Sequence, residues 1–270
     1  GDNVPFPGWE TLHQESAEVD PQLLLIIRDA AGQPVRRLKG AAKAGLHRIS
    51  WDLRESVPNP ISLKKEQGSP WMGKPAGPLV PPGAYSVELL LVTAAGTESL
   101  SAPQSFALKP VETLPEGMAH TAGAAFQKEA AELLRLVSGA GKELARAQSR
   151  LKHVQAALIE TPAADSALFG QASGLHEQLA ALHTAFLQNK LQEKFNEPGW
   201  PSMQGEAGML FWQVRGTRQA PTATQQRLLS DAQARFATLK QELESRLVVL
   251  EGLETAVSEA GAPWTPGRKL

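Results

Sequence analysis

Hydrophobic and polar residues follow one pattern up to about residue 112 and a different pattern after it. In the first part, residues 23–28 and 85–92 form apolar runs, while residues 35–38 and 47–53 alternate between apolar and polar. Such runs, separated by turns rich in Gly and Pro, are typical of β-strands. About six short strands are therefore expected, which favours an antiparallel immunoglobulin-like or fibronectin-like β-sandwich.

The alternation is clearest over residues 47–53. Successive side chains of a strand point to opposite faces, so one face is expected to hold His47, Ile49, Trp51 and Leu53. Trp51 is expected in the core of the sandwich, and Tyr85 is also assigned a structural role. His47 is interpreted as a packed core side chain and not as a general base.

Asp52 is expected on the outward face of the same strand, beside Arg48 and Arg54. A surface ion pair, which contributes about 0–1 kcal/mol, is a simpler interpretation there than catalysis. Asp52 and Arg54 are therefore assigned structural roles. Glycoside hydrolysis would need two carboxyl groups about 5–10 Å apart around a sugar site, and the other acidic residues are scattered along helical segments. This segment by itself is not expected to be an enzyme.

After residue 118, apolar residues recur every three or four positions. This spacing runs through residues 126–158, 168–186 and 229–257, and it is typical of long helices that pack side by side. Three such segments predict an antiparallel three-helix bundle.

Two segments interrupt these patterns. Residues 57–79 hold five prolines and are expected to form a long loop. Residues 196–221 are too long for a plain turn and carry several large apolar side chains. A short helix over residues 206–214 that closes one end of the bundle is the simpler interpretation, and a partner or ligand surface is the alternative. The last helix is expected to begin at Thr222 or Thr224.

Composition narrows the partners that can be expected. The chain has 270 residues, 42% hydrophobic and 20% charged, with a formal net charge of −1. The chain lacks the excess of basic residues that nucleic-acid binding would need. No apolar run approaches the roughly 18 residues of a membrane span. The absence of cysteine excludes disulfides and thiolate chemistry. Because the chain opens with Gly1 instead of Met, Gly1 is interpreted as a cleavage or cloning remnant with the natural start upstream.

The histidines do not have the spacing of a metal site. His176 and His183 lie seven positions apart, whereas a metal-binding pair on a helix needs a spacing of three or four. The chain also lacks HExxH, calcium-loop and phosphate-loop motifs. No metal and no cofactor are expected.

Tryptophan is unusually frequent, with six residues against one tyrosine. Trp71, Trp200 and Trp212 lie in segments that contain Pro or Gly, and exposed rings of this kind can stack on sugars. These three residues are therefore the candidate ligand-binding residues, with carbohydrate as the ligand. The favoured alternative is that the rings anchor long loops onto the two domains, because each ring can bury a large area.

Several motifs resemble those of known families. The stretches LIIRD at 25–29, GQPVRRL at 32–38, GLHRISWDLR at 45–54 and PPGAYSV at 81–87 are similar to the immunoglobulin-like domain of flagellar hook-capping proteins. The order of a sandwich followed by helices also resembles the C-terminal region of bacterial sortilin-like and neuraminidase-type-repeat (BNR) propeller proteins. The residues that carry this second resemblance are WDLR at 51–54, Pro221-Thr222 and PWTPG at 263–267.

The resemblance implies a periplasmic or extracellular bacterial location and an upstream β-propeller as partner. Proteins of this kind are often described as glycosyl hydrolases, but that description belongs to the propeller. The present chain has no blade-length β repeats, so no catalytic residue is carried over.

Pattern and resemblance together predict an α+β protein of two domains. The expected divisions are an extended arm at 1–19, a sandwich at 20–112, a bundle at 118–260 that contains the loop at 196–221, and a tail at 261–270. The expected function is a non-catalytic accessory or scaffold region that packs against or presents the propeller through its arm and its Trp-bearing loops. The alternatives are a carbohydrate-binding module, and a helical self-association or adhesion module that uses Leu187 or Leu191.

Overall fold

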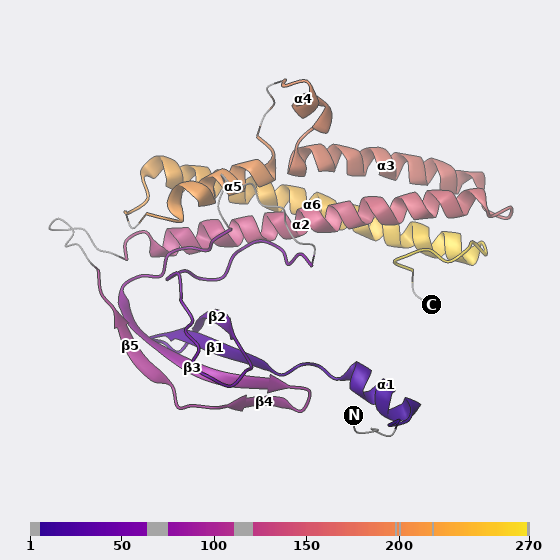
Figure 1. The fold of residues 1–270 in the computed structure, drawn as a ribbon. Coiled ribbons are helices and arrows are strands. Elements are labelled where there is room, and N and C mark those ends of the chain that lie inside the picture. The colour runs from indigo at the N-terminus through magenta and orange to yellow at the C-terminus, as the bar shows by residue number, and fades with distance from the viewer. Residues whose placement is uncertain are drawn as a thin grey trace. The chain divides into compact units, whose positions relative to one another are not determined.

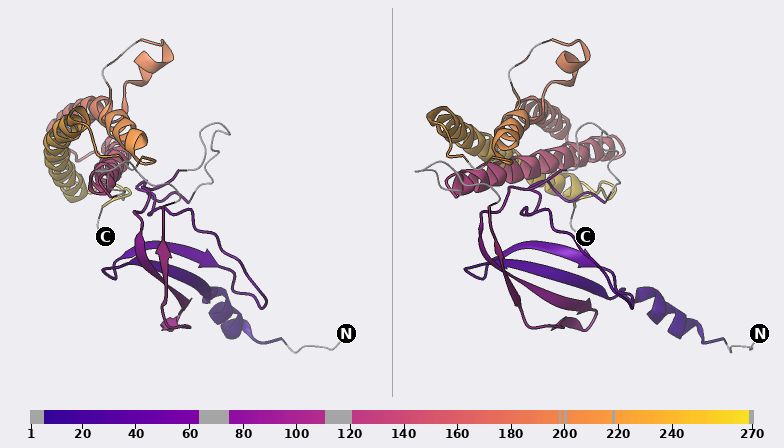
Figure 2. Two further views of the ribbon diagram at one scale, coloured as in Figure 1. Left: turned by 90° about the vertical axis from the view of Figure 1, so that its left-hand side faces the viewer. Right: turned by 60° about the vertical axis from the view of Figure 1, so that its left-hand side comes forward.

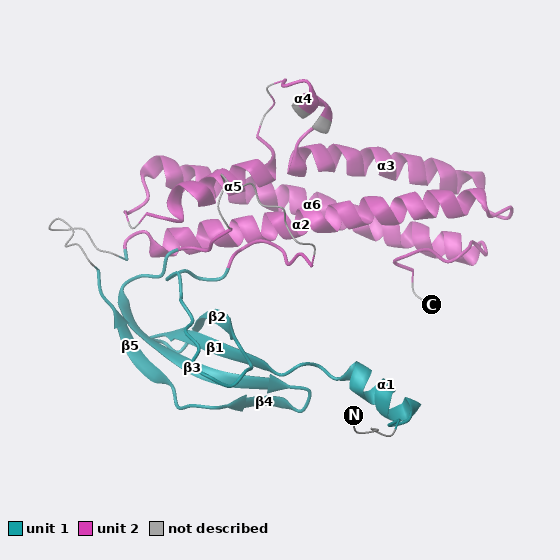
Figure 3. Cartoon of the chain, viewed as in Figure 1, with its two compact units in different colours: residues 1–56, 79–121 teal, residues 57–78, 122–270 magenta. Residues whose placement is uncertain are grey.

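The structure is a computed structural model that describes residues 6–63, 75–110, 121–197, 199, 201–217 and 219–268, without the side chains of Lys190 and Glu193. The chain divides into two compact units (Figure 3). The sheet unit comprises residues 1–56 and 79–121, and the helical unit comprises residues 57–78 and 122–270. The described residues of the proline-rich segment, 57–63 and 75–78, thus belong to the helical unit, although the sequence places them between two strands. The α+β class is confirmed.

The sheet unit is built on five antiparallel strands (Figure 1). Their order is β2-β1-β3-β4, and β5 also pairs with β3. The strands are β1 (Gln22–Asp29), β2 (Pro34–Gly40), β3 (Gly83–Thr93), β4 (Gly96–Ser99) and β5 (Gln104–Leu108). A short helix, α1 (Trp9–Ala17), precedes them.

The turn between β1 and β2 follows directly from its residues. The Oδ1 atom of Asp29 accepts hydrogen bonds from the backbone N–H groups of Ala31, at 3.0 Å, and Gln33, at 2.9 Å. Gly32 adopts a φ of 75°, which costs a glycine little. β1 and β2 thus form an antiparallel hairpin.

One face of the sheet carries the unit's small core. Ile27 and Tyr85 of the strands are fully buried there together with Val80. Partly buried side chains pack around them: Val35, Leu38, Trp51, Val87, Phe106 and Leu108. On the opposite face Arg28 forms an ion pair with Glu88 at 3.8 Å.

The prediction of a strand over residues 47–53 is wrong. These residues form no strand; Arg54 makes an isolated bridge to Leu79, and Leu53 has a φ of 56°, which extended backbone does not allow. His47 is exposed, and its Nε2 atom lies 2.8 Å from the carbonyl oxygen of Lys43, so its predicted place in the core is also wrong. The described residues form a single sheet, and the predicted two-sheet sandwich is not confirmed.

The helical unit is dominated by two long helices, α2 (Ala124–Ile159) and α6 (Ala223–Glu259). Between them in sequence lie α3 (Ser166–Leu187), α4 (Lys190–Lys194) and α5 (Met203–Val214). Both α3 and α5 contact α2 and α6, one after the other along the bundle (Figures 1 and 2). Because α5 packs against α2 and α6 together with α3, the predicted bundle of three helices is not confirmed.

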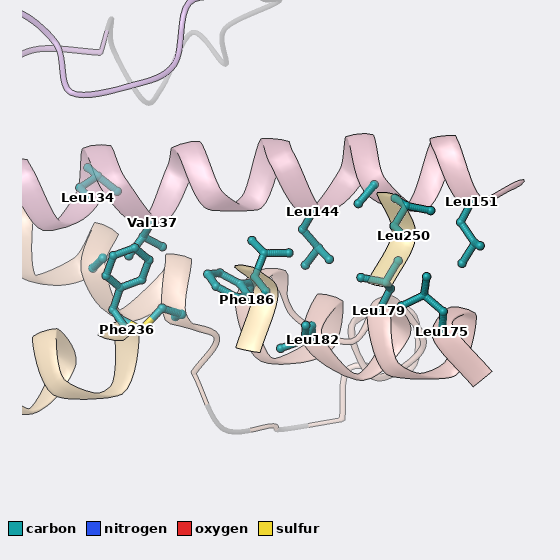
Figure 4. Close-up of a cluster of buried hydrophobic side chains, with 14 of the residues drawn as sticks. Leu134, Val137, Leu144, Leu151, Leu175, Leu179, Leu182, Phe186, Phe236 and Leu250 are labelled. Atoms are coloured by element: carbon teal, nitrogen blue, oxygen red, sulfur yellow. The ribbon is translucent and has the colours of Figure 1, made fainter. Parts of the chain in front are cut away.

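In α2, α3 and α6 most of the buried side chains are those of the predicted apolar spacing. Leu144, Leu179, Phe186 and Leu250 are almost completely inaccessible (Figure 4). The rings of Phe186 and Phe236 meet edge to face at 6.4 Å between centroids. The short helix expected at 206–214 exists as α5, and it buries Met203, Ala207, Leu210, Phe211 and Val214.

Candidate functional site

Trp51, Tyr85 and Phe106 form an aromatic cluster in the sheet unit. The centroid of the Trp51 ring lies 5.8 Å from that of Tyr85 and 6.4 Å from that of Phe106, both edge to face. Tyr85 and Phe106 face each other in the register of β3 and β5, and their rings stack at 5.9 Å. These separations are within the range of favourable aromatic pairs, so the cluster is a packing element of the core.

The polar atoms around this cluster are engaged by the backbone. The Tyr85 hydroxyl donates to the carbonyl oxygen of Pro81 at 2.6 Å, and Trp51 Nε1 donates to the carbonyl oxygen of Arg54 at 2.9 Å. The backbone N–H of Arg54 donates to Asp52 Oδ1 at 3.2 Å. Asp52 and Arg54 therefore shape the turn that brings Trp51 over the sheet.

Trp212 is the one candidate ligand-binding residue whose surroundings are described, since Trp71 and Trp200 lie outside the described residues. Trp212 sits on the outer side of α5, and 59% of its surface is exposed. The guanidinium carbon of Arg215 lies 4.1 Å from the centroid of its ring. A cation at this distance over the ring is a favourable contact, and it occupies a face that a sugar would stack on.

A cavity of about 380 Å³ lies where the C-terminal tail returns to the ends of α2 and α6. Its central feature is a bidentate ion pair: Arg150 Nε and Nη2 donate to the two carboxylate oxygens of Glu254 at 2.9 Å and 2.5 Å. The side chains are only 12% and 6% exposed, respectively. The hydrogen bonds that Arg150 donates to Glu254 hold the pKa of Arg150 above its ordinary value. Both oxygens of Glu254 are occupied, which argues against a role as a general base.

The tail is held against this ion pair. Arg268 donates to Ser258 Oγ and to the carbonyl oxygen of Pro263, both at 2.6 Å. Gly267 lies so close to Arg150 that a β-carbon there would be 2.6 Å from the Arg150 Nε atom. Among the described residues, the buried Thr265 Oγ1 atom has no hydrogen-bond partner. The arrangement fastens residues 261–268 to the bundle.

The pairing of Arg150 with Glu254 could not be found from the sequence, because 104 positions separate the two residues and neither belongs to a motif. The apolar spacing places both helices but says nothing about which polar residues meet across them.

Over the described residues, no three His, Asp or Glu side chains lie together in a way that could hold a metal ion. None of the described helices has the length and apolar character needed to cross a bilayer. No family model matches the chain, and no curated protein or solved structure matches it either. The resemblance to hook-capping and propeller proteins therefore stays a hypothesis.

Proposed function

We propose that this chain is a non-catalytic accessory region of a larger exported bacterial protein, and that it packs against or presents an upstream β-propeller. The observation that carries the proposal is an apolar sheet face that is only partly covered. A face of this kind gains stability when another surface covers it.

The open part of this face lies beside the small core. Leu23 and Leu25 of β1 pair with Leu91 and Leu89 of β3, and all four side chains are only half-buried. Above them the chain returns as an irregular segment: a β-carbon at Gly40 would be 3.5 Å from Ile49 Cδ1. That segment leaves Ile49 38% exposed and Leu46 89% exposed. The segment that was expected to form a strand thus covers the sheet incompletely.

Tyr85 supports the immunoglobulin-like part of the proposal. Its hydroxyl donates a hydrogen bond to the carbonyl oxygen of Pro81, four residues upstream and just before β3. A tyrosine that closes on the preceding backbone in this way is a recurrent feature of immunoglobulin-like sandwiches. The sheet unit is accordingly proposed to be a reduced immunoglobulin-like domain, and the helical unit a three-helix bundle whose middle helix is divided into α3 and α5.

Co-expression tests this function. The domain encoded directly upstream would be produced with this chain, either unchanged, with Leu91→Lys on the open face, or with the control Thr97→Lys. Thr97 pairs with Val92, so it lies on the opposite face of the sheet. We expect a propeller that co-purifies with the unchanged chain and with the control but is lost with Leu91→Lys. An upstream region without blade repeats, or equal binding by both variants, would contradict the proposal.

Carbohydrate binding is the alternative function. Among the described residues, the exposed ring of Trp212 favours it. We would compare glycan-array binding of the chain with that of its Trp212→Ala, Trp71→Ala and Trp200→Ala variants. Loss of glycan binding at an unchanged melting temperature would favour this alternative.

For self-association through the bundle, Leu187 is partly buried against the core, whereas Leu191 on α4 is 66% exposed. Leu191 is therefore the residue of the two that could serve such a contact.

A further inference from the structure

Helices α3 and α5 form one continuous row along the bundle. A β-carbon at Gly141 of α2 would lie 3.0 Å from Leu187 at the end of α3 and 3.8 Å from Gln204 near the start of α5. Beyond the other end of α5, the carbonyl oxygen of Thr217 accepts a hydrogen bond from Gln127 near the start of α2. The two helices therefore meet at one level of α2, and α5 continues the line of α3 (Figures 1 and 2).

The outward side of this row carries almost no charge. With histidine counted as neutral, Glu177 is the only charged residue among the exposed residues of α3 and α5, two helices that are described from end to end. Exposed charged residues recur along α2, by contrast, and include Lys128, Glu132, Lys142 and Arg146. Depletion of charge is a feature of the centre of protein–protein interfaces.

The residues that point away from α2 and α6 follow each other at spacings of three or four. Because Leu187 and Gln204 share a level of α2, Gly205 continues this spacing where α3 ends. The outward line therefore passes from small residues on α3 to large apolar residues on α5, and it includes Gly170, Gly174, Ala181, Gly205, Met209 and Trp212. The side chains of Met209 and Trp212 are 61% and 59% exposed.

The two halves of this line are complementary in size. A β-carbon at Gly170 or Gly174 would meet no atom within 4 Å, so packing inside the molecule does not require glycine there. Glycine in the interior of a helix also weakens that helix. Exposed Met209 and Trp212, for their part, gain stability when another surface covers them. Both features are accounted for when the α5 half of one molecule covers the α3 half of another.

We propose that two copies of this chain form a twofold symmetric dimer in which their α3–α5 rows pack antiparallel. The twofold axis passes between Ala181 and Thr184. The helical spacing then places Trp212 of one copy over Gly170 of the other and Met209 over Gly174. The contact is isologous and closes at two copies, because each row supplies both halves.

The distribution of charge permits this pairing. A twofold contact places a face against itself, so a strongly charged face would repel its own copy. The only charged residue of the line, Glu177, lies opposite Gly205. The two Glu177 side chains of the dimer are separated by about 17 Å along the helices, from a rise of about 1.5 Å per residue. This separation exceeds the Debye length of about 8 Å at physiological salt.

The row is also long enough for a stable dimer. With 22 residues in α3 and 12 in α5, it is about 50 Å long, and at a width of about 10 Å its flat footprint is about 500 Å². Stable interfaces bury about 800 Å² of accessible surface per partner, which exceeds a flat footprint because side chains interdigitate. Helix α4 projects from the row where α3 ends (Figures 1 and 2), so its exposed Leu191 and Phe195 stand beside the second copy and add to the area.

The mass of the chain in solution tests the proposal. Sedimentation equilibrium over the micromolar range is expected to give a dimer of the 28.9 kDa chain. A monomer at every concentration would overturn the proposal and leave the α3–α5 face to a different protein.

Filling a glycine position identifies the face. Gly174→Leu is expected to raise the dissociation constant at least about tenfold, because the new side chain takes the space of Met209 of the second copy. Circular dichroism should show the variant folded, since leucine is the better helix former. The control is Gly252→Leu in α6, where a β-carbon also meets no atom within 4 Å; it should leave the dissociation constant unchanged. Equal effects of the two substitutions would overturn the proposal.

A compensating pair tests the register. Gly170→Leu should weaken the dimer because leucine collides with Trp212 of the second copy, and adding Trp212→Ala to the same chain should restore part of the association. A double variant that associates no better than Gly170→Leu alone would contradict the proposed pairing. These experiments use the present chain alone, so their failure would leave the proposed packing on a propeller untouched.

Discussion

At the scale of single residues, the ion pair between Arg150 and Glu254 is the best-defined polar feature of the helical unit. Its two hydrogen bonds, its low exposure and the tail folded over it distinguish it from surface pairs such as Arg135 with Glu132. In the surface pair, Arg135 lowers the pKa of Glu132, but both side chains stay more than half exposed and solvent screens their attraction.

We expect Glu254→Gln to lower the free energy of unfolding by about 3 kcal/mol, because it leaves the Arg150 cation buried without a counter-charge. Urea denaturation of the two proteins would measure this loss. The control is Glu242→Gln on an exposed position earlier in α6, which should change stability by less than about 0.5 kcal/mol. Equal effects of the two substitutions would show that the geometry of the pair is unimportant.

At the scale of secondary structure, the helix starts are set by side chains that accept backbone hydrogen bonds. Asp165 accepts from the N–H of Ala167 at the start of α3, and Ser202 accepts from that of Gly205 at the start of α5. Helix α6 begins with a capping box in which Thr222 and Gln225 bond reciprocally. The sequence left Thr222 and Thr224 open as caps, and the structure selects Thr222.

We therefore expect Thr222→Ala to destabilise the protein by about 1 kcal/mol, because it leaves an N–H group of the first turn without its acceptor. Thr224→Ala is the matched control: it lies inside the helix, where Ala is the better helix former, and should be neutral or slightly stabilising. Thermal melts followed at 222 nm, a helix-sensitive wavelength, would compare the two. A larger loss for Thr224→Ala would contradict the assigned helix start.

At the scale of the whole molecule, the two units have separate cores of very different size. The sheet unit's cluster has three fully buried members, whereas the helical unit joins side chains from α2, α3, α5 and α6 in one large cluster. A unit with a small core buries little apolar area to offset the entropy of folding, so the sheet unit should be the less stable one.

Differential scanning calorimetry should accordingly resolve two transitions, with the sheet unit unfolding first. Ile27→Ala should lower only the first transition and Leu250→Ala only the second, each by about 2–5 kcal/mol for the unit that loses the side chain. If both substitutions shifted a single common transition, the two cores would unfold as one cooperative unit.

The sequence by itself determined the elements whose signal is local and repeated. Apolar residues at every third or fourth position place α2, α3 and α6, and the turn at Asp29–Gly32 places the β1–β2 hairpin. A local sequence pattern is enough to predict these elements, because each helix or hairpin forms most of its hydrogen bonds within itself.

Only the tertiary structure decided which segments find partners. Residues 47–53 alternate like a strand, but a strand needs a neighbour to satisfy its backbone, and the left-handed turn at Leu53 leaves them as an irregular cover over the sheet. In the same way, the meeting of Arg150 with Glu254 and the contact of Gly267 with Arg150 join residues far apart in the chain. Pairings of this kind depend on how whole helices and loops pack, and that arrangement has no local sequence pattern.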